Sequence, residues 1–137
     1  MELACSLDQL QDICSAITGL LPEGGVVILQ GDLASGKTTL TQAFAKHLGL
    51  NDAVTSPTFS LQQCYGDRLF HYDIYNQGLD HFLSLGMLEE LERDGYHLIE
   101  WGDESLAELL KAAQIATVIV EISKADENRR TYRINNA

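Results

Sequence analysis

The sequence predicts an α/β fold in which helices flank a central mixed, largely parallel sheet. Segments with the β-branched, apolar character of strands alternate with segments whose apolar residues recur at helical spacing. A Gly-rich loop of the form GxxxxGK[ST] joins one such strand to one such helix. Two pairs of strand-like segments are separated only by short polar turns, which predicts hairpins and therefore some antiparallel strands in the same sheet.

The first predicted helix spans residues 7–20. Ser6 and Gln9 resemble a capping box at its start, in which polar side chains satisfy free backbone N–H groups. Pro22 and the two glycines behind it end the helix. The apolar residues that recur at helical spacing, and are therefore expected in the core, are Leu7, Leu10, Ile13, Cys14, Ile17 and Leu20.

A buried strand and a second helix follow. Residues 26–29 read VVIL, a continuous and largely β-branched run that is typical of a strand buried on both faces. The second helix is predicted over residues 37–48, and Gly49 suits its C-terminal cap. The Gly-rich loop lies between this strand and this helix.

The rest of the chain continues the alternation of strands and helices. Gly66 and Asp67 predict a hairpin turn, Gly86 predicts a break in a long helical segment, and a polar turn is expected near Asn128. The predicted segments are strand 60–65, strand 68–75, helix 79–94, strand 96–101, helix 103–113, strand 117–122 and strand 129–134.

Length and composition favour one globular domain over residues 1–137, with a hydrophobic fraction of 45% and a charged fraction of 21%. The net charge of −11, without a basic patch, disfavours direct binding of nucleic-acid phosphates. Three cysteines without metal-ligand spacing predict reduced, buried thiols. The start of the chain does not resemble a signal peptide, and the longest apolar run, residues 112–122, is too short to span a bilayer. The expected location is the cytoplasm, with no membrane contact.

The Gly-rich loop fits the phosphate-binding pattern, and its chemistry explains each residue type. Phosphate oxygens need several N–H donors that converge on a small volume; small residues let the backbone approach, and the helix N-terminus adds donors and a favourable dipole. Lys37 is expected at the β- and γ-phosphates, Thr38 at Mg²⁺ and Thr39 near the α-phosphate. The residues expected to bind the nucleotide in this loop are Gly31, Asp32, Leu33, Ala34, Ser35, Gly36, Lys37, Thr38 and Thr39. The pattern and its setting predict a P-loop NTPase-like sandwich.

Two acidic residues end predicted strands. Glu100 stands at the edge where α/β sheets place their ligands, so it is either a metal-binding carboxylate or a surface acid at a strand end. For Asp73, a functional role and a turn-capping role are equally favoured. His71 can titrate, but the sequence favours a half-buried strand histidine.

Three landmarks follow the loop in order: TSPTF at residues 55–59, HYDIY at residues 71–75 and IEW at residues 99–101. Together with GDLASGKTT, this combination resembles the TsaE family, also called YjeE, over about residues 7–134. The resemblance implies a small bacterial ATPase, using ATP and Mg²⁺, that takes part in making threonylcarbamoyladenosine in tRNA. The chain departs from the family pattern twice, with Ala34 where Gly is usual and Asn76 where Arg is frequent.

The resemblance also implies roles for individual residues. Besides the loop, Ser56 and Thr58 would lie near the γ-phosphate in a switch-like segment. Thr38 and Glu100 would hold Mg²⁺, and Asp73 would position water. The implied catalytic group is thus Lys37, Asp73 and Glu100. The family works with a TsaB–TsaD partner complex, which implies that tRNA is reached only through partners.

Three alternatives remain open on the sequence. One is a non-enzymatic, ATP-dependent assembly factor whose hydrolysis is incidental, and a variant that binds ATP without hydrolysing it would distinguish it in the assembled system. The other two are classes of nucleotide-binding protein. Residues 123–126 read SKAD and loosely resemble the guanine-reading element of a GTPase-like regulatory switch, although Ser stands in place of Asn. A small-molecule kinase would share the phosphate loop, but such kinases usually supply several Arg from a lid, and this chain has few basic residues. Nucleotide competition distinguishes the first class, and phosphate transfer to an acceptor distinguishes the second.

Overall fold

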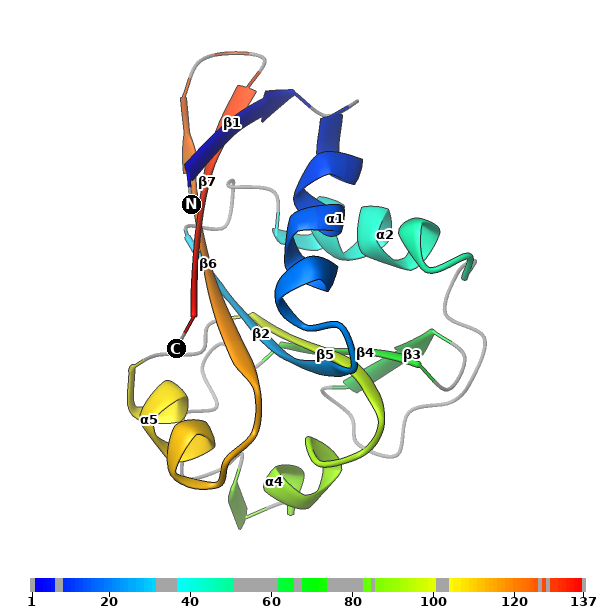
Figure 1. Cartoon of the computed structure of the whole chain (residues 1–137), viewed down its shortest axis with the longest axis vertical. Coiled ribbons are helices and arrows are strands. Elements are labelled where there is room, and N and C mark those ends of the chain that lie inside the picture. Colours follow the sequence, from blue (N-terminus) through cyan, green and yellow to red (C-terminus); the bar gives the residue numbers. More distant parts are fainter. Residues whose placement is uncertain are drawn as a thin grey trace.

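The structure is a computed structural model that describes residues 2–6, 9–31, 37–50, 62–65, 68–73, 83–84, 86–100, 104–125, 127 and 129–136. Its strands form one seven-stranded sheet in the order β1-β7-β6-β2-β5-β4-β3, with helices on both faces (Figure 1). The elements are β1 (Glu2–Ser6), α1 (Leu10–Leu20), β2 (Gly24–Gln30), α2 (Lys37–His47), β3 (Gln62–Tyr65), β4 (Leu69–Asp73), α4 (Met87–Glu90), β5 (Gly95–Glu100), α5 (Glu104–Ala112), β6 (Thr117–Lys124) and β7 (Arg129–Asn136).

The centre of the sheet is parallel and its edges are antiparallel. Strand β2 pairs in parallel with both β5 and β6, and β4 pairs in parallel with β5. The β3–β4 and β6–β7 pairs are the two predicted antiparallel hairpins. The predicted fold class, an α/β fold with a mixed sheet flanked by helices, is therefore confirmed, with three of the six strand pairs parallel.

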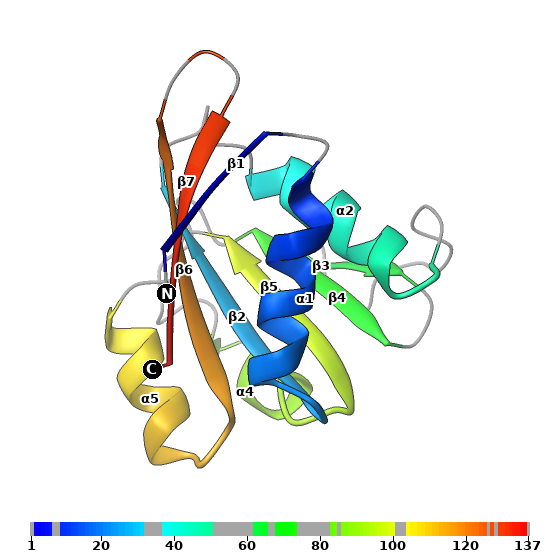
Figure 2. The same ribbon diagram turned by 45° about the horizontal axis from the view of Figure 1, so that its top comes forward.

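The two faces of the sheet carry separate apolar cores. Helices α1 and α2 lie side by side over one face, and α5 lies over the other (Figures 1 and 2). Because side chains alternate along a strand, Val27 and Leu29 of β2 pack with the α1/α2 side, whereas Val26 and Ile28 pack with the α5 side. All four are fully buried, as predicted for a strand with two covered faces.

The predicted helices over residues 7–20 and 37–48 are α1 and α2, with modest differences at their ends. The Ser6 N–H donates to Gln9 Oε1 over 3.0 Å, as in a capping box, but α1 begins at Leu10 with Gln9 at its N-cap, so this contact precedes the helix. Leu20, which was expected in the core, is 36% exposed, whereas the next residue, Leu21, is 3% exposed and packs in the core beside α1. Gly49 has φ +76°, the left-handed conformation that a glycine cap supplies after α2.

Strand β1 was not predicted. It is short and lies at the edge of the sheet, where it pairs antiparallel with β7. Leu3 is half-buried and Cys5 is buried, so the apolar side chains do alternate, but over only five residues. Cys5, Cys14 and Cys64 are free and buried, as predicted.

Within the described residues, the helix predicted over residues 79–94 is wrong only at its end, over residues 91–94. Helix α4 ends at Glu90, and the N–H groups of Glu92 and Arg93 bond to carbonyls three residues earlier, as in tight turns. The chain must enter β5 at Gly95, so the helix has no room to continue. The predicted break at Gly86 falls at a turn directly before α4.

Candidate functional site

The carboxyl ends of three parallel strands meet at one edge of the sheet. Glu100, the last residue of β5, stands opposite Leu29 of β2 on one side and opposite Asp73 of β4 on the other. Neighbouring strands lie about 4.8 Å apart, so these three backbone positions are direct neighbours. Gln30 and Gly31 follow Leu29 at the same edge, and Gly31 has φ +144°, which favours glycine where the chain leaves the strand.

Glu100 projects on the same face of the sheet as α2. Leu98, two residues earlier in β5, belongs to the core that also contains Leu40 and Phe44 of α2. Residues two apart in a strand point to the same face, so Glu100 points to that face as well. Helix α2 begins at Lys37, and a helix N-terminus favours anions through its free N–H groups and its dipole. The Glu100 carboxylate and the N-terminus of α2 therefore lie on one face of the sheet.

The carboxylate of Glu100 is buried and has a partner inside the protein. Glu100 is 6% exposed and His71 is 7% exposed. His71 Nε2 and Glu100 Oε2 are hydrogen-bonded. An ionised carboxylate only accepts, so Nε2 of His71 carries the proton and donates it.

The sequence favours a half-buried strand histidine at position 71 and gives it no role in the site. In the structure His71 is buried and hydrogen-bonded to Glu100, a predicted site residue. The available signal was its place two residues before Asp73, since positions two apart in a strand share a face. The sequence left open that Glu100 is a surface acid at the end of a strand. Its side chain is buried, so that interpretation is wrong.

Several predicted site residues lie outside the described residues, and their roles stay predictions. They are Asp32, Leu33, Ala34, Ser35, Gly36, Ser56 and Thr58, and the same holds for the departing position Asn76. The structure places the backbones of Lys37 and Thr38 in the first turn of α2 and that of Asp73 at the end of β4. Thr39 is exposed on α2.

A buried polar network on the opposite face holds β4 beside its neighbours. The hydroxyl of Tyr72 donates to His97 Nδ1 over 2.8 Å and accepts from Gln62 Nε2 over 3.2 Å. His97 Nε2 donates to the carbonyl of Arg93 over 2.8 Å, and Gln62 Nε2 also reaches Glu90 Oε1 over 3.0 Å. The network ties β3, β4 and β5 to the segment after α4.

This network makes the stability of the fold depend on pH. Burial lowers the pKa of His97, and the hydrogen bond to the Arg93 carbonyl and the Glu90 carboxylate only partly oppose that shift. The unfolded chain takes up this proton near pH 6.5, and the folded chain only at lower pH. Between the two pKa values the unfolded state holds more protons, so the free energy of unfolding falls as the pH falls through this window.

We therefore expect His97→Gln, which cannot titrate, to flatten the loss of stability below about pH 6.5. One proton accounts for at most about 1.4 kcal/mol per pH unit in the free energy of unfolding. Chemical denaturation of both proteins from neutral to mildly acidic pH measures the difference. Tyr72, Glu90 and Arg93 also face His97 and are unchanged in the variant, so parallel curves would contradict the assignment.

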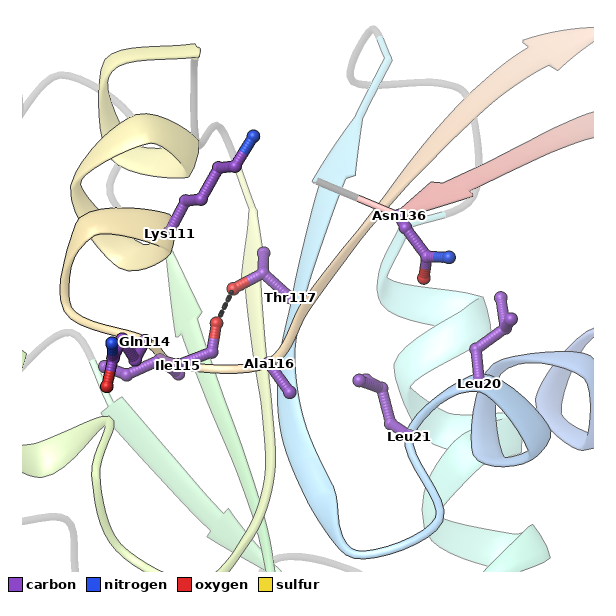
Figure 3. Close-up of a pocket in the computed structure, with 8 residues that line it drawn as sticks. All are labelled: Leu20, Leu21, Lys111, Gln114, Ile115, Ala116, Thr117 and Asn136. Carbon is purple, nitrogen blue, oxygen red and sulfur yellow. Dashed lines mark hydrogen bonds between the residues drawn. The ribbon is translucent and has the colours of Figure 1, made fainter.

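A pocket of about 350 Å³ lies at the amino ends of the parallel strands, opposite to the end that carries Glu100 (Figure 3). It opens where Thr117 begins β6 and Leu21 follows α1, and Thr117 Oγ1 donates to the carbonyl of Ile115 over 2.9 Å. These residues are at the amino end of the parallel strands, away from Glu100, so this pocket is separate from the candidate site. A pocket of about 360 Å³ does border the site edge, where it includes Gln30 and Gly31 of the chain leaving β2 and residues of β6 and β7.

Comparison with known proteins decides the family. The family model described as threonylcarbamoyl adenosine biosynthesis protein TsaE matches residues 4–132. The chain belongs to the TsaE family. The match covers nearly the whole described fold, from β1 into β7.

Relatives named tRNA threonylcarbamoyladenosine biosynthesis protein TsaE support the assignment. The protein from Treponema pallidum is 43% identical over 93 residues, which is 66% of this chain and 69% of that protein. The protein from Bacillus subtilis is 31% identical over 128 residues, covering 91% of this chain and 79% of that protein. The crystal structure of YdiB from Bacillus subtilis superposes with a TM-score of 0.66 at 27% identity, over all of this chain and 84% of that one.

None of the helices in the described part combines the length and the apolar character needed to cross a membrane. Within the same residues, no three His, Cys, Asp or Glu side chains cluster as a metal centre.

Proposed function

We propose that this TsaE-family chain binds ATP with Mg²⁺ at the carboxyl edge of β2, β5 and β4 and hydrolyses the ATP in support of threonylcarbamoyladenosine formation in tRNA. One observation supports this most directly. The buried carboxylate of Glu100 lies on the same sheet face as the α2 N-terminus, at the strand edge where the GxxxxGK[ST] loop starts. Such an edge offers N–H donors for phosphates and an oxygen ligand for a cation.

The residues present fit a magnesium ion. Mg²⁺ usually keeps several waters and binds proteins through one or two carboxylates together with substrate phosphates. Glu100 supplies one buried carboxylate oxygen pair, and Thr38 in the first turn of α2 would add its hydroxyl. When bound, the ion would offset the charge that develops on the transferred phosphoryl group.

Other residues of the chain would bind the phosphates and orient the attacking water. Lys37 would pair with the β- and γ-phosphates as a compact cation at the start of α2. Ser56 and Thr58 would contact the γ-phosphate through their hydroxyls. Asp73, beside Glu100 in the register of β4 and β5, would orient the water that attacks the γ-phosphorus and releases ADP and phosphate.

The proposed partner is a TsaB–TsaD complex in the cytoplasm, and tRNA would be contacted through that complex. The net charge of −11 supports contact with tRNA through the partner complex, because phosphates of tRNA repel an acidic surface. The relatives from Treponema pallidum and Bacillus subtilis are named for tRNA threonylcarbamoyladenosine biosynthesis, which supports the same pathway here.

Glu100→Gln tests the proposal. We expect Mg²⁺ half-saturation of ATP hydrolysis to rise at least about tenfold, because an amide keeps the shape but loses the charge that holds a hard cation. Nucleotide affinity without Mg²⁺ should change little. The Gln carbonyl can still accept from His71, so the fold should persist, which circular dichroism would verify.

Glu92→Gln is the matched control, since Glu92 is exposed in the turn after α4. It should keep the wild-type Mg²⁺ dependence. If Glu100→Gln also kept it, Glu100 would not be the metal-binding group and the proposal would lose its main support.

A further inference from the structure

We propose that His71 is a positioning residue that orients the Glu100 carboxylate for Mg²⁺. The inference rests on the proposed function and deepens it, because it names the residue on which the metal-binding geometry depends. His71 touches neither metal nor nucleotide in this proposal and acts only through its hydrogen bond to Glu100.

The register of the sheet determines from which side His71 reaches the carboxylate. His71 stands opposite Leu98 on β5, two residues before Glu100 and therefore toward the amino end of the parallel strands. The imidazole thus approaches the carboxylate from the protein interior. In this proposal the other carboxylate oxygen faces the carboxyl end of β5.

The hydrogen bond uses one of the two carboxylate oxygens. His71 Nε2 contacts Oε2 of Glu100, which restricts rotation about the last side-chain bond. The other oxygen, Oε1, is then held in one direction and can serve a cation or one of its waters. Metal-binding carboxylates are commonly hydrogen-bonded in this way, and loss of such a partner costs about 10–100-fold in metal affinity.

Burial makes this bond more than an incidental surface contact. Both side chains are less than a tenth exposed, so water competes poorly for either of them. Without the imidazole N–H, the Glu100 carboxylate would turn toward water or toward another donor. A purely structural role would instead lower stability and leave the Mg²⁺ dependence unchanged, which separates the two explanations.

Substitutions of His71 in the full chain test the proposal, because they move the hydrogen-bond donor relative to Glu100 or remove it. In His71→Gln the amide N–H extends to about the place of imidazole Nε2, whereas in His71→Asn it is one methylene shorter, and His71→Leu has no donor. The probe is a non-hydrolysable ATP analogue titrated calorimetrically at several Mg²⁺ concentrations and in EDTA. The hydrolysis rate against Mg²⁺ gives a second readout.

The three variants are expected to differ in how far they raise the Mg²⁺ half-saturation. His71→Leu and His71→Asn should raise Mg²⁺ half-saturation about 10–100-fold with little change of analogue affinity in EDTA, and His71→Gln should restore most of the wild-type value. His71→Leu should add no further effect in a Glu100→Gln background, because the two groups act through one bond.

His97→Gln is the matched control. His97 is also a buried histidine of the same sheet, but its partners Tyr72 and Arg93 lie on the other face. It should lower stability and keep the wild-type Mg²⁺ half-saturation.

Wild-type Mg²⁺ half-saturation in folded His71→Leu would overturn the inference. If that variant does not fold, equal wild-type values in His71→Asn and His71→Gln would overturn it in the same way. In either case a defective Glu100→Gln would leave the proposed function standing. A Glu100→Gln protein with wild-type Mg²⁺ dependence would overturn both.

Discussion

Lys37→Ala is expected to lose ATP affinity by about 10–150-fold while the fold stays intact. Lys37 is the only side-chain cation in residues 31–39, and its backbone begins α2. A hydrogen bond to a charged group contributes roughly 1.5–3 kcal/mol, which corresponds to this range of binding constants. Titration calorimetry with ATP measures the affinity, and circular dichroism checks the fold.

Lys46→Ala is the matched control for that change. Lys46 is exposed in the last turn of the same helix, far from the N-terminal end. Its removal should leave ATP affinity within a factor of two or so and lower helix stability by at most about 1 kcal/mol. Equal ATP affinity in folded Lys37→Ala and wild type would refute the phosphate-loop assignment.

The second large effect is expected in hydrolysis with the partner complex. The chain alone should hydrolyse ATP slowly, and the TsaB–TsaD pair should raise the rate well beyond the sum of the separate rates. The candidate groups come from the ends of different strands and from segments between them, so a partner that contacts several of them would align water for attack. Asp73→Ala should then lower the stimulated rate by about 10²-fold or more, the usual contribution of a residue that handles the attacking water.

The measurement compares steady-state hydrolysis by the chain, by the pair and by the mixture, followed by tRNA modification over many turnovers. Asp94→Ala serves as the control, because Asp94 is an exposed aspartate at the amino end of β5 rather than at the candidate edge. Additive rates in the mixture would contradict partner activation. Full modification by Asp73→Ala would separately remove Asp73 from the mechanism.

Local sequence patterns predicted most of the elements correctly. The VVIL run, the two hairpins and the helix after the Gly-rich loop each carry their signal within a few neighbouring residues. Strand β1 and the early end of α4 were missed because their signals are not local. Strand β1 exists through its pairing with β7, and α4 stops because the chain must enter β5.

The features of the candidate site likewise fall into those predicted by local sequence and those that depend on the tertiary structure. The sequence by itself determined the phosphate-loop pattern, the helix that follows it, and two acids at the ends of strands, because each of these depends on residue type and short spacing. It also supplied the family, since the motifs keep their order along the chain.

Only the tertiary structure decided which of these residues are neighbours. The strand order places β5 between β2 and β4, and the register then brings Asp73 beside Glu100. The bond between His71 and Glu100 joins residues 29 apart, and that between Tyr72 and His97 joins residues 25 apart. Such contacts depend on strand order, register and burial together, and periodicity along one segment reports none of these.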